Sequence, residues 1–357
     1  MLPIRGPVEA IGADSKLPLC FRAVLPTANS GVECSLFDSH PMATSRFLTI
    51  LSAAALLIGA LFEPAKASAQ AAAYVISDNT TGYVLESSNP EKKLQIGSLT
   101  KIATAMVVLD WAAAKESDLA QMATVPDSAQ ALSAESGIGL HPGDQVSLRD
   151  LLYAAMMQSD NQAAETLASH VGRTLITSGV EITSVNAFVA QMNALARRLG
   201  MNRTRFLNPH GLDSIERTLP YSTAEDLAKL TRYAMSNSAF LFYVSQKERK
   251  ITIQTSAAPS QYLLRNTNEL LGTQSIDGVK TGTTRKAGPC VIISAGRPPE
   301  SRQEGESHII TPRRLNIIVL NARDRFPFAA QQLARGWKLY DAWAAAGRPI
   351  KGKQAAR

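Results

Sequence analysis

A serine and a lysine three residues apart, Ser98 and Lys101, have the types and the spacing that nucleophilic catalysis needs. A serine hydroxyl is a weak nucleophile unless an adjacent base takes its proton. A lysine amine can be that base only when burial or a nearby cation lowers its pKa. On its own, such a pair is more often an N-cap serine followed by a solvent-exposed lysine, because motifs of this length recur by chance. The rest of the sequence must decide between these interpretations.

The residues after Lys101 predict the element that holds this pair. Apolar side chains recur at spacings of three and four from Ile102 to Ala113, which predicts an amphipathic helix that ends near Lys115. Ser98 then lies near the N-terminus of that helix, and positions i and i+3 share one helix face, so the hydroxyl and the amine can point into one site. The helix N-terminus also offers N–H groups to a developing oxyanion.

Two more polar stretches follow in the chain. Ser159-Asp160-Asn161 comes at the end of a predicted helix, 148–158, that is apolar on most sides, and another helix, 163–170, departs from it. Polar side chains at a junction of buried helices must find partners or line a cavity. Lys280-Thr281-Gly282 belongs to a predicted strand over 276–283, in which small residues gather toward the end.

The order of the predicted elements indicates an α+β fold. Strands are expected at 73–77, 82–86, 291–294 and 315–320, and helices at 185–199, 222–235 and 328–345. This order predicts one antiparallel sheet, built from the two terminal segments and flanked by helices, together with a helical subdomain. Segments 172–183 and 296–313 look like insertions, and the second would lengthen a hairpin loop between strands.

The N-terminal region predicts export. Residues 1–41 have no helical or strand period, and we interpret them as an over-long start or a disordered leader before a start at Met42. Residues 42–69 combine a basic residue, an apolar run and a small-x-small site, the pattern of a signal peptide cleaved after Ala69. The run is short of the ~20 apolar residues of a membrane span, so no integral anchor is expected after cleavage. We expect a periplasmic or cell-envelope protein with its main domain at 70–347 and a short basic tail at 348–357.

Composition argues against several other classes of protein. The 357 residues are 45% hydrophobic and 19% charged, as in ordinary globular proteins. The net charge of +7 comes without a long Lys/Arg block, so nucleic acid is not expected as a partner. Beyond residue 69 the sole cysteine is Cys290, which we interpret as a small buried hydrophobe. The histidines lack metal-ligand spacing, so neither a metal nor another cofactor is expected.

The motifs S-x-x-K, S-x-N and K-T-G in this order form the signature of class A β-lactamases and penicillin-binding proteins. The chain resembles, more narrowly, the low-molecular-weight penicillin-binding proteins that are D-alanyl-D-alanine carboxypeptidases, serine peptidase family S11. Matches between about 73 and 347 include Gly143-Asp144, Asn208-Pro209-His210-Gly211-Leu212 and Asp277-Gly278-Val279. The resemblance implies a β-lactamase/transpeptidase-like fold. It also implies a hydrolase that removes the terminal D-alanine from peptidoglycan stem peptides and that penicillins inhibit covalently.

The resemblance further implies a role for each motif residue. Ser98 would form the acyl-enzyme, Lys101, kept neutral by burial and by Lys280, would accept its proton, and Ser159 would pass a proton to the leaving amine. The substrate would be bound by Asn161, Lys280, Thr281, Gly282 and Thr283, with the N–H groups of Ser98 and Thr283 as the oxyanion hole. An arginine after the last strand, Arg325 by approximate alignment or otherwise Arg323, would hold the substrate carboxylate unless it is an ordinary surface arginine.

Related activities stay open at this level. The family commonly has Gly or Ala in the middle of the S-x-N motif. This chain has Asp160 there, and β-lactamases often have an aspartate at that position. Class A β-lactamases also use a glutamate in an E-x-x-L-N loop, and no such pattern occurs between Asn161 and Lys280, which favours the peptidase. A D,D-endopeptidase would use the same groups. A non-catalytic penicillin-sensing or wall-binding domain would have no need of a serine beside a lysine base.

Overall fold

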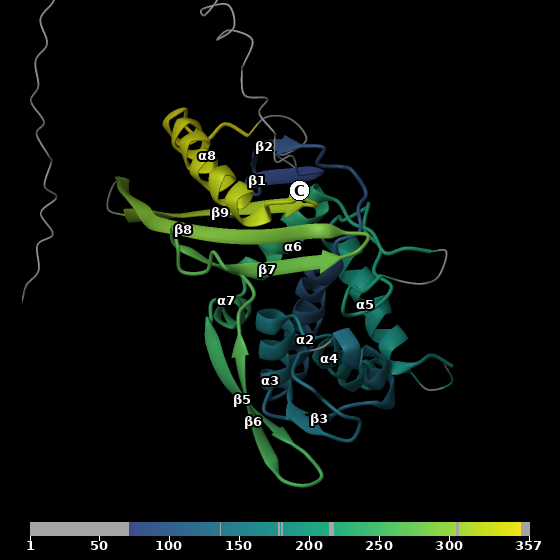
Figure 1. The fold of residues 1–357 in the computed structure, drawn as a ribbon. Helices are drawn as coiled ribbons and strands as arrows, with labels where there is room; N and C mark the ends of the chain where they lie inside the picture. Colours follow the sequence, from purple (N-terminus) through teal and green to yellow (C-terminus); the bar gives the residue numbers. More distant parts are fainter. Residues whose placement is uncertain are drawn as a thin grey trace, which may run out of the picture. The chain divides into compact units, whose positions relative to one another are not determined.

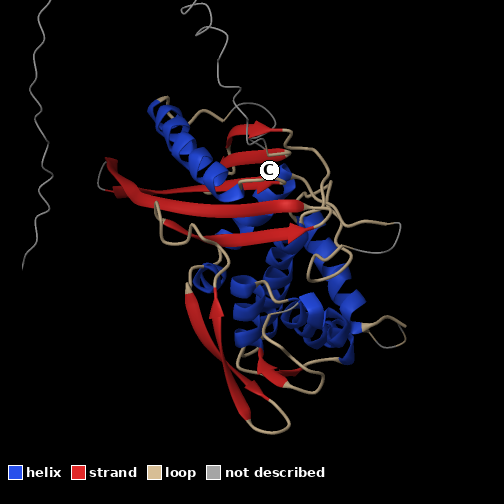
Figure 2. Cartoon of the chain, viewed as in Figure 1, coloured by secondary structure: helices blue, strands red, loops and turns tan. Residues whose placement is uncertain are grey.

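The computed structural model describes residues 71–350 except 136, 178, 180, 214–217 and 305–306. The predicted leader and signal peptide, and residues 351–357 of the basic tail, lie outside this part of the chain. The first two strands and the last three strands of the described chain form one five-stranded antiparallel sheet with the order β2-β1-β9-β8-β7 (Figures 1 and 2). Its strands are β1 (Ala73–Asp78), β2 (Val84–Ser88), β7 (Ile276–Thr284), β8 (Gly288–Glu304) and β9 (Ser307–Leu320). The predicted α+β architecture with an antiparallel sheet is confirmed.

Both faces of this sheet are covered. Successive side chains of a strand point to opposite faces, so a sheet covered on both sides has apolar residues at consecutive positions. Ile76, Ile293 and Ile317 pack in one apolar cluster with helix α8 (Arg325–Ala345). Val75, Ile292 and Ile318, each next to one of these residues in its strand, pack in the other cluster, with the remaining helices. Figure 1 shows α8 on one face of the sheet and α6 (Ala224–Met235) on the other.

The helical part is built around α2 (Lys101–Lys115), in which eleven of the fifteen residues are buried. Around it lie α4 (Asn161–Leu175), α5 (Ser184–Arg198), α6 and α7 (Ser238–Val244). Helix α3 (Leu148–Tyr153) packs against α4 and α7, and the 3-10 helix η2 (Asp127–Glu135) packs against α4. In the described part of the chain, no helix combines the length and the apolar character needed to cross a membrane.

Two helices differ from their predicted bounds. The predicted helix over 148–158 is α-helical to Tyr153 and then a π-helical turn, η3 (Ala154–Gln158). The helix predicted from residue 163 begins at Asn161, because Asp160 caps its N-terminus, and it continues to Leu175. Asn161 therefore lies in the first turn of a helix instead of in a loop.

The sequence did not predict a second, four-stranded sheet. It has the order β3-β4-β5-β6 and consists of β3 (Met122–Thr124), β4 (Gln145–Ser147), β5 (Glu248–Gln254) and β6 (Pro259–Arg265). Ile251 and Ile253 are buried at alternate positions of β5 while their neighbours are more exposed. This period-two pattern, followed by a polar turn, was the available signal.

The expectation of a lengthened loop over 296–313 is wrong. The pairing of β8 with β9 continues as far as Glu304 opposite Ser307, so the additional residues extend a hairpin of two strands. The register shifts between Arg297 and Glu300. Pro298 and Pro299 lie at this shift, where their missing N–H groups cost no regular ladder hydrogen bond.

Candidate active site

Ser98 and Lys101 meet at the start of α2. Ser98 lies in a 3-10 turn, η1 (Gly97–Thr100), that leads directly into the helix at Lys101. The Lys101 Nζ atom lies 3.1 Å from Ser98 Oγ, 2.7 Å from Asn161 Oδ1 and 2.7 Å from the carbonyl oxygen of His210. A neutral amine has two N–H bonds and one lone pair. When the two oxygen acceptors take the N–H groups, the lone pair faces the hydroxyl of Ser98.

The surroundings of Lys101 favour this neutral state. Its side chain has no exposed surface, and burial lowers its pKa to about 7, although the nearby Asp160 acts in the opposite direction. Burial also lowers the pKa of Lys280 well below its usual value, and the positive charges of Lys101 and Arg325 lower it further. Repulsion between the two buried amines is mutual, so a positive charge on either one disfavours a positive charge on the other.

The carboxylate of Asp160 connects the S-x-N motif to a distant loop. Its Oδ1 atom accepts a hydrogen bond of 2.8 Å from the backbone N–H of Ala163, which caps α4. Its Oδ2 atom accepts bonds from the N–H groups of Gly137 and Ile138, at 3.0 and 3.2 Å. The preceding residue, Ser159, is partly buried and has a left-handed backbone with φ of 66°, which is uncommon for a serine and is often found at functional sites.

The end of β7 packs against η1. A Cβ atom added to Gly282 would lie 2.9 Å from the carbonyl oxygen of Ile96 and 3.2 Å from the backbone nitrogen of Ser98. Only glycine therefore permits this approach of the two backbones. A Cβ on Gly97 would lie 3.3 Å from the backbone nitrogen of Thr283, so the N–H groups of Ser98 and Thr283 belong to two neighbouring segments.

The threonine and lysine of the K-T-G motif are held within the protein. Lys280 is almost fully buried, and its Nζ atom donates to the carbonyl oxygen of Thr281 at 3.1 Å. The hydroxyl of Thr281 lies 2.6 Å from that of Thr267. Thr267 was not singled out as a site residue from the sequence.

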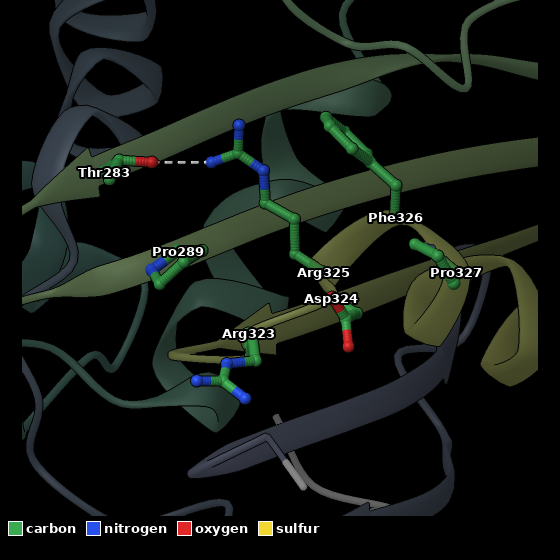
Figure 3. A pocket seen from close by; sticks show the side chains of 7 residues that line it. All are labelled: Thr283, Pro289, Arg323, Asp324, Arg325, Phe326 and Pro327. Atoms are coloured by element: carbon green, nitrogen blue, oxygen red, sulfur yellow. Dashed lines mark hydrogen bonds between the residues drawn. The ribbon is translucent and has the colours of Figure 1, made fainter. Parts of the chain in front are cut away.

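Of the two arginines considered, Arg325 reaches the end of β7. Its Nη1 atom donates to Thr283 Oγ1 at 2.7 Å (Figure 3). The same atom donates to the carbonyl oxygen of Gly282 at 3.1 Å. Its burial lowers its pKa from the usual arginine value. Arg323 is exposed, and it has no hydrogen bond or ion pair with any residue between 71 and 350 that the structure describes.

A loop over 208–212 completes the surroundings of Lys101. The hydroxyl of Thr104 donates to the carbonyl oxygen of Pro209 at 2.6 Å, and a Cβ on Gly211 would lie 2.0 Å from the carbonyl oxygen of Gly97. This packing places the carbonyl oxygen of His210 against Lys101. Burial and the charge of Lys101 lower the pKa of His210 to about 3, so its ring is neutral. The sequence of this loop matches the family but does not indicate its role, because its contribution is a backbone oxygen.

The structure thus brings together Ser98, Lys101 and Asn161 in direct contact and places the end of β7, with Arg325, beside them. This arrangement supplies a hydroxyl nucleophile, a buried amine base and two N–H donors on adjacent segments, which are the parts that acyl transfer needs. Within the described part of the chain, no three His, Cys, Asp or Glu side chains are grouped so that they could hold a metal ion.

Comparisons with known proteins agree with this geometry. A family model described as D-alanyl-D-alanine carboxypeptidase matches residues 61–302. The carboxypeptidase DacC of Escherichia coli is 33% identical over 278 residues, which are 76% of this chain and 61% of DacC. A D-alanyl-D-alanine endopeptidase of Pseudomonas aeruginosa is 32% identical over 271 residues, 74% of this chain and 75% of that protein.

A solved structure is also similar. The Streptomyces K15 DD-transpeptidase superimposes with a TM-score of 0.62 at 27% identity, over 76% of this chain and 97% of that one. This similarity supports the predicted transpeptidase-like fold. The chain spans 61% of the length of DacC. From the motifs, the site geometry and these matches together, the chain belongs to the D-alanyl-D-alanine carboxypeptidase family.

Proposed function

We propose that this protein is a serine-type D-Ala-D-Ala carboxypeptidase that removes the terminal D-alanine from peptidoglycan stem peptides through an acyl-enzyme on Ser98. The observation that carries the proposal is the position of Lys101 Nζ, which lies 3.1 Å from Ser98 Oγ and 2.7 Å from each of two other acceptors, Asn161 Oδ1 and the carbonyl oxygen of His210. A lysine with a purely structural role does not need a serine hydroxyl within hydrogen-bonding distance of its amine. A base for that serine must be placed there.

The acylation step follows from these contacts. Lys101 takes the proton of Ser98, and Oγ attacks the carbonyl carbon between the two D-alanines. The N–H groups of Ser98 and Thr283 hold the resulting oxyanion, because both nitrogens lie where β7 meets η1. The proton returns through Ser159 to the amine nitrogen, the C–N bond breaks, and D-alanine leaves. Water then hydrolyses the ester on Ser98, and Lys101 acts as the base again.

Substrate binding uses the groups around this centre. Asn161 supplies an amide to the substrate backbone while its Oδ1 atom accepts from Lys101. Gly282 allows the substrate to lie along β7, with Thr281 and Thr283 as hydrogen-bonding neighbours. Arg325, bonded to Thr283 Oγ1, supplies a cation for the terminal carboxylate, and Lys280 adds positive potential when it is protonated. Penicillins, which acylate a serine, would react with the same groups.

The location of the activity follows from the N-terminal region. We propose that residues 42–69 direct export and that the protein works in the periplasm, at the cell envelope, where its peptide substrates are. The family membership supports an envelope site of action. Processing can be measured directly by determining the N-terminal residue of the protein purified from the periplasmic fraction, which should be Gln70.

The test of the catalytic proposal uses two substrates in parallel. The protein is incubated with a labelled penicillin and with a peptide that ends in D-Ala-D-Ala, and D-alanine release is followed. A lasting label that Ser98→Ala abolishes, together with released D-alanine, supports the carboxypeptidase. Rapid penicillin turnover without D-alanine release would indicate a serine β-lactamase, and a stable label without either turnover would indicate a penicillin sensor. Either of these last two results would contradict the proposal.

A further inference from the structure

A pocket of about 330 Å³ lies where the end of β7 meets the turn from β9 into α8 (Figure 3). Its walls include Thr283 and Arg325 on one side and Pro289, Arg323, Asp324 and Phe326 around them. The volume falls in the range of about 300–1,000 Å³ that ligand pockets have. Ser98 and Lys101 are not part of its lining, so the pocket adjoins the catalytic centre and does not contain it.

The position of the pocket relates it to the leaving residue of the substrate, an argument that rests on the proposed function. Arg325 and Thr283 are the groups that would receive the terminal carboxylate, and both line the pocket. The leaving residue therefore has its carboxylate at the wall of this pocket and its side chain next to it. The methyl group of D-alanine would leave most of the 330 Å³ to water.

The lining of the pocket combines an apolar wall with a free cation. The Phe326 ring lies under the guanidinium of Arg325, 4.7 Å from the ring centroid, and Pro289 adds a second apolar surface. Arg325 is already held by Thr283 and Gly282, whereas Arg323 makes no hydrogen bond or ion pair with the described residues of the chain. Asp324 contributes one negative charge. Because Arg325 is assigned to the terminal carboxylate, Arg323 is the cation of the lining that is left for a group on the side chain.

We propose that this pocket is a subsite for the side chain of the leaving residue, and that it favours a D-amino acid whose side chain extends by several carbons and ends in a carboxylate facing Arg323. The carbon chain would lie along Phe326 and Pro289. Hydrolysis proceeds as for D-alanine: the bond between the acyl carbon and the leaving nitrogen breaks, and the nitrogen takes a proton. The enzyme would then also cleave peptides in which the leaving residue, the one after D-alanine, is larger than a second D-alanine.

The test compares four peptides with the same acyl part that end in D-Ala–D-Xaa, where Xaa is alanine, norleucine, α-aminoadipate or lysine. The value of kcat/KM is measured from release of the D-amino acid. Norleucine tests the room for the chain, and the two charged residues test the sign of the charge. We expect α-aminoadipate to exceed norleucine by about fivefold, the upper range for a solvent-exposed ion pair, and lysine to show no such gain. Added salt should reduce the advantage.

Two variants assign the effect to Arg323. Arg323→Gln should remove most of the advantage of α-aminoadipate over norleucine. Lys338→Gln makes the same charge change at an exposed position of α8 and should preserve the advantage. Equal rates for α-aminoadipate, norleucine and lysine, or an equal loss on all four peptides in Arg323→Gln, would overturn the subsite while D-alanine release still supports the carboxypeptidase. Absence of both penicillin labelling and D-alanine release would instead overturn the proposed function, and the subsite with it.

Discussion

The Nζ atom of Lys101 lies 3.1 Å from the Oγ atom of Ser98, and no part of Lys101 is exposed to solvent. The short distance between these two atoms alone would allow Lys101 to be either protonated or neutral. Burial distinguishes between them, because it disfavours the charged form and lowers the pKa of Lys101 to about 7. Asn161 and His210 supply acceptors for both hydrogens of the neutral amine. The base is therefore prepared before any substrate arrives.

The rate of acylation should depend on pH through this group. Because the pKa of Lys101 is lowered to about 7, the neutral amine predominates above that pH and the ammonium below it. We expect the second-order rate constant of penicillin labelling to rise with pH and to reach half of its maximum at an apparent pKa of about 7. The measurement is labelling under excess penicillin from about pH 5 to about pH 9. A rate that is unchanged below pH 7 would contradict Lys101 as the base.

Lys101→Arg should keep the positive charge and lose the base. A guanidinium stays protonated in proteins, so it cannot accept the proton of Ser98. We expect the rate of acylation to fall by about 10²- to 10⁴-fold. Lys338→Arg, at an exposed position of α8, is the matched control and should label like the unchanged protein. A melting curve for each variant separates loss of catalysis from loss of folding.

Asp160→Asn should move the pH dependence in a defined direction. The negative charge of Asp160 raises the pKa of Lys101, so its removal should lower that pKa and shift the rising limb of the labelling rate to lower pH. The variant also weakens the bonds to Gly137 and Ile138, at a cost of about 1–3 kcal/mol in unfolding free energy.

Asp78→Asn provides the control for that experiment. Asp78 is also a buried carboxylate that accepts a backbone N–H, from Thr81 at 2.6 Å, but it lies in β1 and does not act on Lys101. This variant should lose stability and keep the pH dependence. An unshifted limb in Asp160→Asn would show that Asp160 has no electrostatic effect on the base.

Gly282→Ala should disable the enzyme with little effect on the rest of the fold. The added Cβ would lie 2.9 Å from the Ile96 carbonyl oxygen, so β7 and η1 must separate by several tenths of an ångström. A displacement of about 1 Å in a catalytic site can cost about 10²-fold in rate. Gly296→Ala, also in the sheet, meets the flexible end of Arg314 at 3.3 Å and should retain activity. Equal activity of the two variants would show that the close approach is unimportant.

Arg325→Gln should weaken recognition of a free carboxylate. Loss of one charged hydrogen-bonding partner costs about 1.5–3 kcal/mol, which corresponds to about a ten- to hundredfold decrease in kcat/KM. The same peptide with its terminal carboxylate amidated should react slowly with both proteins and to a similar extent. If the variant and the unchanged protein differ equally on both peptides, Arg325 acts on something other than the carboxylate.

The sequence was informative where side chains carry the signal. Apolar periodicity located α2 and the strands near both ends of the chain, and three short motifs indicated which polar groups would meet. The structure brings Ser98, Lys101 and Asn161 into contact as the motifs suggested. The alternating apolar residues of β5 are also typical of a strand, but this strand was not predicted, and neither was the second sheet to which it belongs.

Other features depend on contacts that a sequence does not display. The acceptor that His210 offers to Lys101 is a backbone oxygen, so no residue type marks it. Asp160 was recognised as unusual, but its bonds to Gly137 and Ile138 join segments 22–23 residues apart across a fold that had first to be known. Residues 296–313 were expected to lengthen the loop of a hairpin, but they continue its two strands, and the two prolines among them lie at a register shift.

The partners of Lys101 lie 60 and 109 residues further along the chain, and the glycine that touches the Ser98 turn belongs to β7. The active site around Ser98 is consequently complete only when the sheet has docked onto the helices. Covalent penicillin can thus serve as an active-site titrant that counts correctly folded molecules. During refolding, the labelled fraction would report the final docking step separately from the earlier appearance of helical signal in circular dichroism.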